Sequence, residues 1–232
     1  MLEQVAIEEL ADRLYGEAGL RADAPASPFR LAMSLLGERA VRRFRDEDLR
    51  LEAYLARVGG EWRIYLREGL SPVRSRFNLG HEIAEWALRR EGIRDGHGMD
   101  VESSADALAA ALLAPRPFAT SACRARGGSW TQLALDFGCT ESCAALRYGE
   151  VTGEPLALVT PASIRERGAP APWPEDSLMR SAAPCPGVVK VRLRDDPNRI
   201  VVTRSVLPRG AAASGAPVQR PRRVSAPAHR RR

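Results

Sequence analysis

His81, Glu82 and Glu85 form the pattern His-Glu-x-x-Glu near the middle of the sequence. On a helix, side chains four residues apart point the same way, so His81 and Glu85 could bind one metal ion. A glutamate directly after the first ligand is where zinc peptidases carry the base that deprotonates the attacking water. The spacing therefore predicts a hydrolytic metal site with His81 and Glu85 as ligands and Glu82 as the catalytic base.

A third ligand is expected on a second helix. Glu102 follows Glu85 by 17 residues, which is enough for a turn and an antiparallel helical return. Asp106 comes one helical turn later and can orient a ligand by hydrogen bonding. We expect Glu102 to bind the metal and Asp106 to position a ligand. His97, in the glycine-containing link between the helices, is either a substitute ligand or an exposed loop histidine.

The helix that carries His81 has clear start and stop signals. Ser71-Pro72 offers a serine N-cap and a proline at the first helical position, and Gly92 marks the end. The partner helix is predicted from Asp100 until Pro115 and Pro117 stop it. The stripe that should face the core, away from the metal residues, consists of Gly80, Ile83, Ala84, Ala87 and Leu88.

Other elements complete an α+β fold. Apolar stripes at helical spacing predict N-terminal helices around residues 7–15 and 29–36. Short β-like runs follow, and Gly59-Gly60-Glu61 joins the last two as a hairpin, which predicts a small antiparallel sheet. The three runs cover residues 40–44, 53–58 and 62–66.

Residues 128–150 predict a pair of helices with the outline of a helix-turn-helix. Ser129 and Gln132 have capping-box spacing, and Thr140 can cap the second helix. A DNA-reading helix should present basic or amide side chains near its start. Here Glu141 stands there and Arg147 is the first cation, so packing or substrate docking is favoured over DNA binding.

The region of the predicted ligands resembles the ImmA/IrrE family of metallo-endopeptidases, with a zincin-like metal helix and a partner helix. The family pattern is an RFxxaHExxH helix followed by ExxAxxFAxxLLxP. The resemblance extends over about residues 5–160 and implies a cytoplasmic, zinc-dependent protease that cleaves a repressor and so releases transcription. The matching positions are Arg76, Phe77, His81, Glu82, Glu102, Ala105, Ala109, Leu112, Leu113 and Pro115.

Two positions depart from the family pattern. Leu108 replaces a phenylalanine, a mild change in a core position, and Glu85 replaces the second histidine. A carboxylate can bind zinc, but a second anionic ligand weakens the Lewis acid and favours harder metals such as Mn²⁺. The chain is thus expected to bind Zn²⁺ or Mn²⁺, or no metal if the site is degenerate.

The sequence divides into three predicted parts. Residues 1–160 form the metallopeptidase-like domain, 161–207 a Pro-rich extension with a β-hairpin, and 208–232 a disordered tail. Residues 206–232 hold seven arginines and no acid, and removing these seven from the net charge of +6 leaves −1. The basicity therefore belongs to the tail, which either binds nucleic acid through electrostatics or keeps the chain soluble.

The remaining features exclude some classes of protein. The sequence has no apolar run long enough for a membrane span and no signal-peptide pattern at its start, so we expect a cytoplasmic protein. The four cysteines lack zinc-site spacing and are expected to be idle or buried thiols. Two functions stay open: a regulatory endopeptidase that cleaves a helix-turn-helix repressor, or a degenerate pseudo-protease that binds a transcription regulator or DNA.

Overall fold

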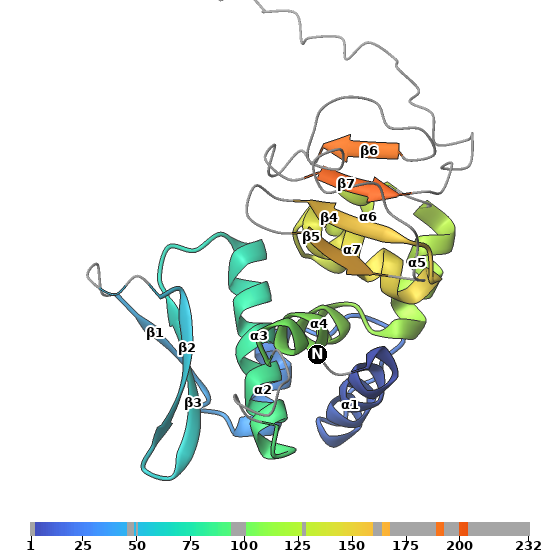
Figure 1. The fold of residues 1–232 in the computed structure, drawn as a ribbon. Helices are drawn as coiled ribbons and strands as arrows, with labels where there is room; N and C mark the ends of the chain where they lie inside the picture. Colours follow the sequence, from blue (N-terminus) through green and yellow to red (C-terminus); the bar gives the residue numbers. More distant parts are fainter. Residues whose placement is uncertain are drawn as a thin grey trace, which may run out of the picture.

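The computed structural model describes residues 3–45, 49, 51–93, 101–126, 129–159, 164–167, 189–192 and 200–203. Within these residues seven helices combine with a three-stranded and a four-stranded sheet, which confirms the predicted α+β class. The three-stranded sheet lies on one side of helix α3, and α4 and α1 lie on the other (Figure 1). No described helix is both long and apolar enough to cross a membrane.

The two N-terminal helices are α1 (Gln4–Glu17) and α2 (Pro28–Leu36). The predicted stripe of α1 is buried, but Phe29 in the stripe of α2 is 48% exposed, which corrects that expectation. Tyr15 ties α1 to α4, because its hydroxyl donates to the carbonyl oxygen of Leu112 at 2.7 Å. The same hydroxyl accepts from the backbone N–H of Ala26 at 3.1 Å.

The first sheet contains β1 (Val41–Phe44), β2 (Ala53–Val58) and β3 (Glu61–Arg67), in the order β1-β3-β2. β2 and β3 form the predicted hairpin through Gly59-Gly60, where both φ angles are positive, 61° and 87°, as a tight two-residue turn requires. β1, however, pairs parallel with β3. The sheet is therefore mixed rather than antiparallel, because β3 inserts between β1 and β2 and runs in the direction of β1.

Helix α3 (Pro72–Arg90) packs between this sheet and α4 (Val101–Leu113). Its predicted N-cap is confirmed, since Ser71 Oγ accepts from the N–H of Arg74 at 3.3 Å. The predicted core stripe of α3 is also buried. Helix α4 is buried on nearly every side by α1, α3 and α7. A central α4 gives the residues at its N-terminal end a rigid support.

Three further helices follow: α5 (Arg116–Arg126), α6 (Trp130–Phe137) and α7 (Glu141–Thr152). The sequence did not predict α5, because proline commonly ends a helix, but Pro117 lies in the first turn of α5, where proline is tolerated. Thr140 caps α7 as predicted, accepting from the N–H of Cys143 at 3.2 Å. Ser129 makes no side-chain cap bond, so the predicted capping box is wrong.

The second sheet has four antiparallel strands in the order β5-β4-β7-β6. β6 and β7 correspond to the strand-like pair predicted in the extension, whereas β4 and β5 were not foreseen. β4 and β5 pair with each other across the domain boundary predicted at 160/161. The tail at 208–232 lies outside the described residues. The strands are β4 (Leu156–Val159), β5 (Ile164–Arg167), β6 (Val189–Arg192) and β7 (Ile200–Thr203).

A buried ion-pair network joins α7 to the N-terminal half of the fold. Arg147 is fully buried, and its guanidinium donates to both carboxylate oxygens of Glu8, at 2.5 and 3.0 Å. It also donates to Glu150 at 3.2 Å and to the carbonyl oxygen of Ala114 at 2.9 Å. Burial alone would raise the pKa of Glu8, but the hydrogen bonds and charge of Arg147 lower it. The network is therefore charged at neutral pH.

Candidate metal centre

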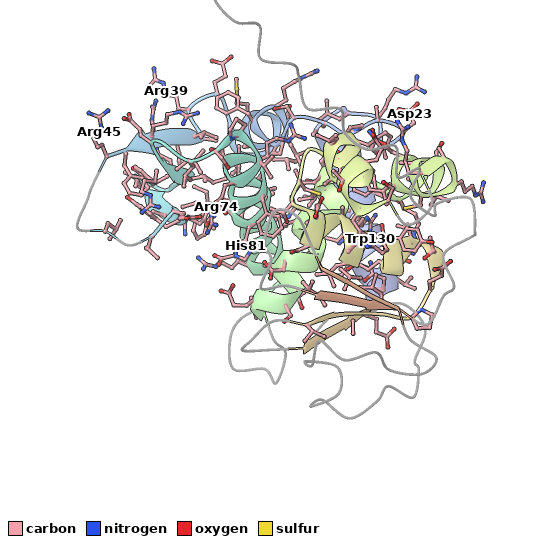
Figure 2. All side chains as sticks on the ribbon, turned by 90° about the horizontal axis from the view of Figure 1, so that it is seen from above. Asp23, Arg39, Arg45, Arg74, His81 and Trp130 are labelled. Atoms are coloured by element: carbon pink, nitrogen blue, oxygen red, sulfur yellow. The ribbon has the colours of Figure 1, made fainter. Side chains whose placement is uncertain are left out.

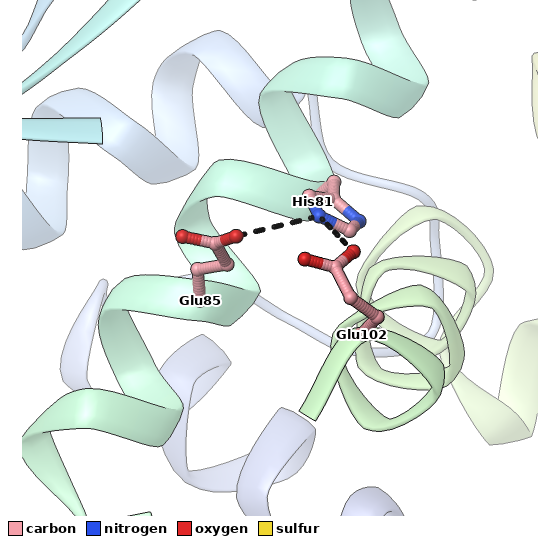
Figure 3. A group of neighbouring side chains, drawn as sticks. All are labelled: His81, Glu85 and Glu102. Carbon is pink, nitrogen blue, oxygen red and sulfur yellow. Dashed lines mark ion pairs between the residues drawn. The ribbon is translucent and has the colours of Figure 1, made fainter. Parts of the chain in front are cut away.

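His81 lies on α3 between the three-stranded sheet and the part of the molecule that contains Trp130 (Figure 2). One ring nitrogen of His81 faces carboxylates from two helices, Glu85 on α3 and Glu102 on α4 (Figure 3). His81 Nε2 is 3.7 Å from Glu85 Oε1 and 3.5 Å from Glu102 Oε2. The three donor atoms all lie within 4.8 Å of one another. The structure thus brings the three predicted ligands together.

These separations suit ligands of one tetrahedral metal ion. Donor atoms about 2.1 Å from a tetrahedral centre lie about 3.4 Å from one another. The distances of 3.5 and 3.7 Å between Nε2 and the two carboxylate oxygens are close to that value. Without a metal, the same atoms form ion pairs between a protonated His81 and the two carboxylates. The donor set of one imidazole and two carboxylates fits zinc or manganese.

Asp106 occupies the other side of the imidazole. Its Oδ1 is 3.1 Å from His81 Nδ1, the nitrogen that faces away from Glu85 and Glu102. A carboxylate on Nδ1 favours the tautomer in which Nδ1 carries the proton and Nε2 is free to bind a cation. Asp106 therefore lies where the sequence expected a residue that orients a ligand.

Glu85 has a second partner that the metal-site pattern did not include. Arg89, one turn further along α3, donates from Nη2 to Glu85 Oε2 at 2.8 Å. The two oxygens of Glu85 therefore face different ways: Oε1 faces His81, and Oε2 accepts from Arg89. The signal was present in the sequence, because a glutamate and an arginine four residues apart on a helix commonly pair.

The electrostatics of the cluster favour a bound cation. Burial lowers the pKa of His81, but its hydrogen bond to Asp106 and the nearby Glu85 carboxylate raise it to about 10. The positive imidazolium in turn lowers the pKa of Glu85. Without a metal, the carboxylates thus hold a proton on His81. A divalent cation could replace that proton and pair with the same negative charges.

Glu82 follows His81 directly on α3 and is buried, with 6% of its surface exposed. Burial of its carboxyl group and the negative charge of Glu85 raise the pKa of Glu82 to about 7. A carboxyl group with a pKa near neutrality can both accept and release a proton under physiological conditions. Glu82 therefore has the protonation behaviour that the predicted general base needs.

The candidate ligands line two hollows in the surface. Glu85 and Glu102 line one hollow of about 470 Å³. His81, Glu82 and Asp106 line another of about 240 Å³. The residues of the candidate site thus border two hollows. Among the described residues, the apolar lining of the larger hollow consists of Trp62, Trp86, Ile93 and Val101.

Two features near the site were not anticipated, and one expected residue cannot be placed. Glu52 accepts from Arg74 at 2.7 Å and from Asn78 at 3.0 Å, which joins the start of β2 to α3 beside the smaller hollow. Arg76 donates from Nε to the carbonyl oxygen of Gly138 at 3.2 Å and so links α3 to the turn before α7. His97 lies outside the described residues.

Helix α7 is not available as a DNA-reading helix in this structure. Glu141, Ser142 and Cys143 in its first turn are buried, and Arg147 has no exposed surface. Helices α5 and α6 and strand β4 pack against it. The described cysteines, Cys123, Cys139 and Cys143, are buried free thiols, and Cys185 lies outside the described residues.

Comparison with known proteins relates this chain to a protein family and to solved structures. The family model of the IrrE N-terminal-like domain (Peptidase_M78) matches residues 35–148. The structure of a transcriptional regulator from Mycobacterium tuberculosis is similar in fold, with a TM-score of 0.53 and 18% identity. That similarity covers 80% of this chain and 64% of the regulator's chain. No curated protein matches the sequence. The match over residues 35–148, a little under half of the chain, supports the ImmA/IrrE family for the part that contains the candidate ligands and Glu82.

Proposed function

We propose that this chain is a metal-dependent endopeptidase that regulates transcription by cleaving a repressor-type protein. The observation that carries the proposal is the convergence of Glu85 and Glu102 on Nε2 of His81, at distances suited to one metal ion. The IrrE N-terminal-like match supports a metallopeptidase-like domain. The fold similarity to a transcriptional regulator is consistent with a regulatory role.

In this proposal His81, Glu85 and Glu102 hold the cation, and Asp106 keeps the His81 ring in place through Nδ1. A bound Zn²⁺ or Mn²⁺ would polarise the scissile carbonyl and make a water molecule more acidic. Zinc is the expected metal, and two carboxylates among three ligands make manganese the alternative. A protein that bound only a large, soft cation such as Cd²⁺, and neither Zn²⁺ nor Mn²⁺, would contradict a site of one imidazole and two carboxylates.

Glu82 performs the proton transfers. Its carboxylate accepts a proton from the attacking water as the oxygen bonds to the peptide carbonyl carbon. The neutral carboxyl group then donates that proton to the leaving amine as the C–N bond breaks. A group with a pKa of about 7 can do both, because neither protonation state is strongly disfavoured at neutral pH.

A second candidate is a degenerate protease that binds a transcription regulator without cutting it. The observation that favours it is the Arg89–Glu85 ion pair, which gives the replaced ligand a partner in the absence of metal. In this case Glu82 would have no chemical role, and its replacement by glutamine would leave the function unchanged. Binding of DNA through α7 is not supported, because the start of that helix is buried.

Cleavage of a repressor tests the proposal. Helix-turn-helix repressors encoded beside the gene are incubated with the full-length chain and added Zn²⁺ or Mn²⁺, and fragments are identified by mass spectrometry. We expect one or a few defined cuts that a chelator abolishes, since hydrolysis requires the cation. Tight binding of a repressor with no cleavage under either metal would favour the degenerate alternative.

A further inference from the structure

We propose that Arg89 is a positioning residue that makes Glu85 a suitable substitute for the family's second histidine. In this role it occupies one oxygen of Glu85, so that the other alone faces the metal, and it offsets the added negative charge. The inference rests on the proposed metal site and concerns how this chain tolerates glutamate at position 85.

The two carboxylate oxygens of Glu85 face different partners. Oε2 accepts from Arg89 at 2.8 Å, while Oε1 lies 3.7 Å from His81 Nε2. The Glu85 side chain is 18% exposed and that of Arg89 is 44% exposed, so a partly exposed guanidinium holds a mostly covered carboxylate. With Oε2 engaged, Glu85 can offer one oxygen, as a histidine offers one nitrogen.

The charges support the same role. A neutral histidine adds no charge to a metal site, whereas glutamate adds one negative charge and donates more strongly to the cation. The Arg89 guanidinium adds one positive charge within hydrogen-bonding distance of that glutamate. Arg89 therefore returns the net charge of the ligand sphere to that of a two-histidine, one-glutamate site.

The neighbouring arginine serves as an internal contrast. Arg90 is directed elsewhere: its guanidinium pairs with Glu17 at 2.6 Å and lies 4.7 Å from the centre of the Trp86 ring. Replacing Arg90 removes the same charge from the adjacent position without touching Glu85. If the Arg89–Glu85 contact were only an ordinary surface ion pair, replacing Arg89 should affect metal binding no more than replacing Arg90.

The test uses Co²⁺ as a spectroscopic probe in the full-length chain and its Arg89→Met, Arg89→Lys and Arg90→Met variants. Four-coordinate cobalt absorbs visible light much more strongly than five- or six-coordinate cobalt. We expect an intense spectrum for the natural protein and Arg90→Met. Arg89→Met should give a weak spectrum, because Glu85 can then bind through both oxygens, and Arg89→Lys should restore much of the intensity.

Metal competition provides a second readout. Removing Arg89 should shift the preference from Zn²⁺ towards Mn²⁺ by roughly tenfold in the ratio of dissociation constants, which corresponds to about 1.4 kcal/mol. In the Glu85→His background, adding Arg89→Met should leave the metal preference unchanged, because Arg89 then has no carboxylate at position 85 to hold. Such a double-mutant comparison isolates the coupling between the two positions.

Each outcome bears on a different claim. An Arg89→Met protein with the natural spectrum and metal preference would overturn the role of Arg89 while leaving the metal site intact. An equal effect of Arg89→Met with Glu85 or with histidine at position 85 would also overturn it, because Arg89 would then act through something else. Failure of the natural protein to bind any metal would overturn both this inference and the proposed function.

Discussion

Replacing Glu82 by glutamine should lower kcat for peptide cleavage by about 10²- to 10⁴-fold while leaving metal content unchanged. Glutamine keeps the shape of the side chain but cannot accept a proton from the attacking water. The buried position of Glu82 leaves little room for solvent to take over that transfer. The measurement is single-turnover cleavage of the identified substrate, with metal content determined on the same protein samples.

The matched control is Glu9→Gln, the same chemical change at an exposed position of α1. It should leave both cleavage and metal content at the natural level. A Glu82→Gln protein that cleaves at the natural rate would contradict the assignment of Glu82 as the base. A Glu82→Gln protein that loses its metal would instead give Glu82 a structural part in the site.

Arg147→Met should destabilise the fold by about 3–5 kcal/mol, because it removes the buried cation that pairs with the carboxylates of Glu8 and Glu150. For a chain of this size the expected fall in Tm is roughly 10 °C. The loss should weaken the attachment of α7 to α1, because Arg147 is the group that holds the two carboxylates together. Urea and thermal unfolding, followed by circular dichroism, measure both quantities.

Two further variants define the cause. Arg126→Met breaks the exposed pair with Asp136 and should cost no more than about 1 kcal/mol. Adding Glu8→Gln to Arg147→Met should recover part of the lost stability, since it removes a buried negative charge that has lost its main partner. If Arg147→Met and Arg126→Met lowered the free energy of unfolding by similar amounts, the buried network would not stabilise the fold more than an exposed ion pair does.

Local signals in the sequence predicted the helix that carries the candidate ligands. Ser71-Pro72 marked its start, and helical spacing identified its buried stripe, because both depend on residues within a few positions of one another. The same local reasoning placed Glu102 on the next helix. The convergence of Glu102 on His81 also depended on the family resemblance, since spacing alone cannot set how two helices pack.

Features that depend on distant packing were not predictable in the same way. The parallel pairing of β1 follows from where β3 inserts, and no residue in β1 encodes it. The sequence shows Arg147 only as the first cation of a predicted helix, and its buried ion pair with Glu8 joins residues 139 positions apart. Pro117 illustrates a local ambiguity, because proline both ends helices and occurs in their first turn.

The most direct test of the metal site is the metal content of the full-length protein. The protein is purified without a histidine tag and measured by inductively coupled plasma mass spectrometry, beside the His81→Ala and Glu85→His variants. We expect about one equivalent of zinc or manganese in the natural protein and in Glu85→His, and none in His81→Ala, which lacks the ligand between the two carboxylates. A natural protein without metal, beside a Glu85→His variant that binds one equivalent, would contradict a working site built from His81, Glu85 and Glu102.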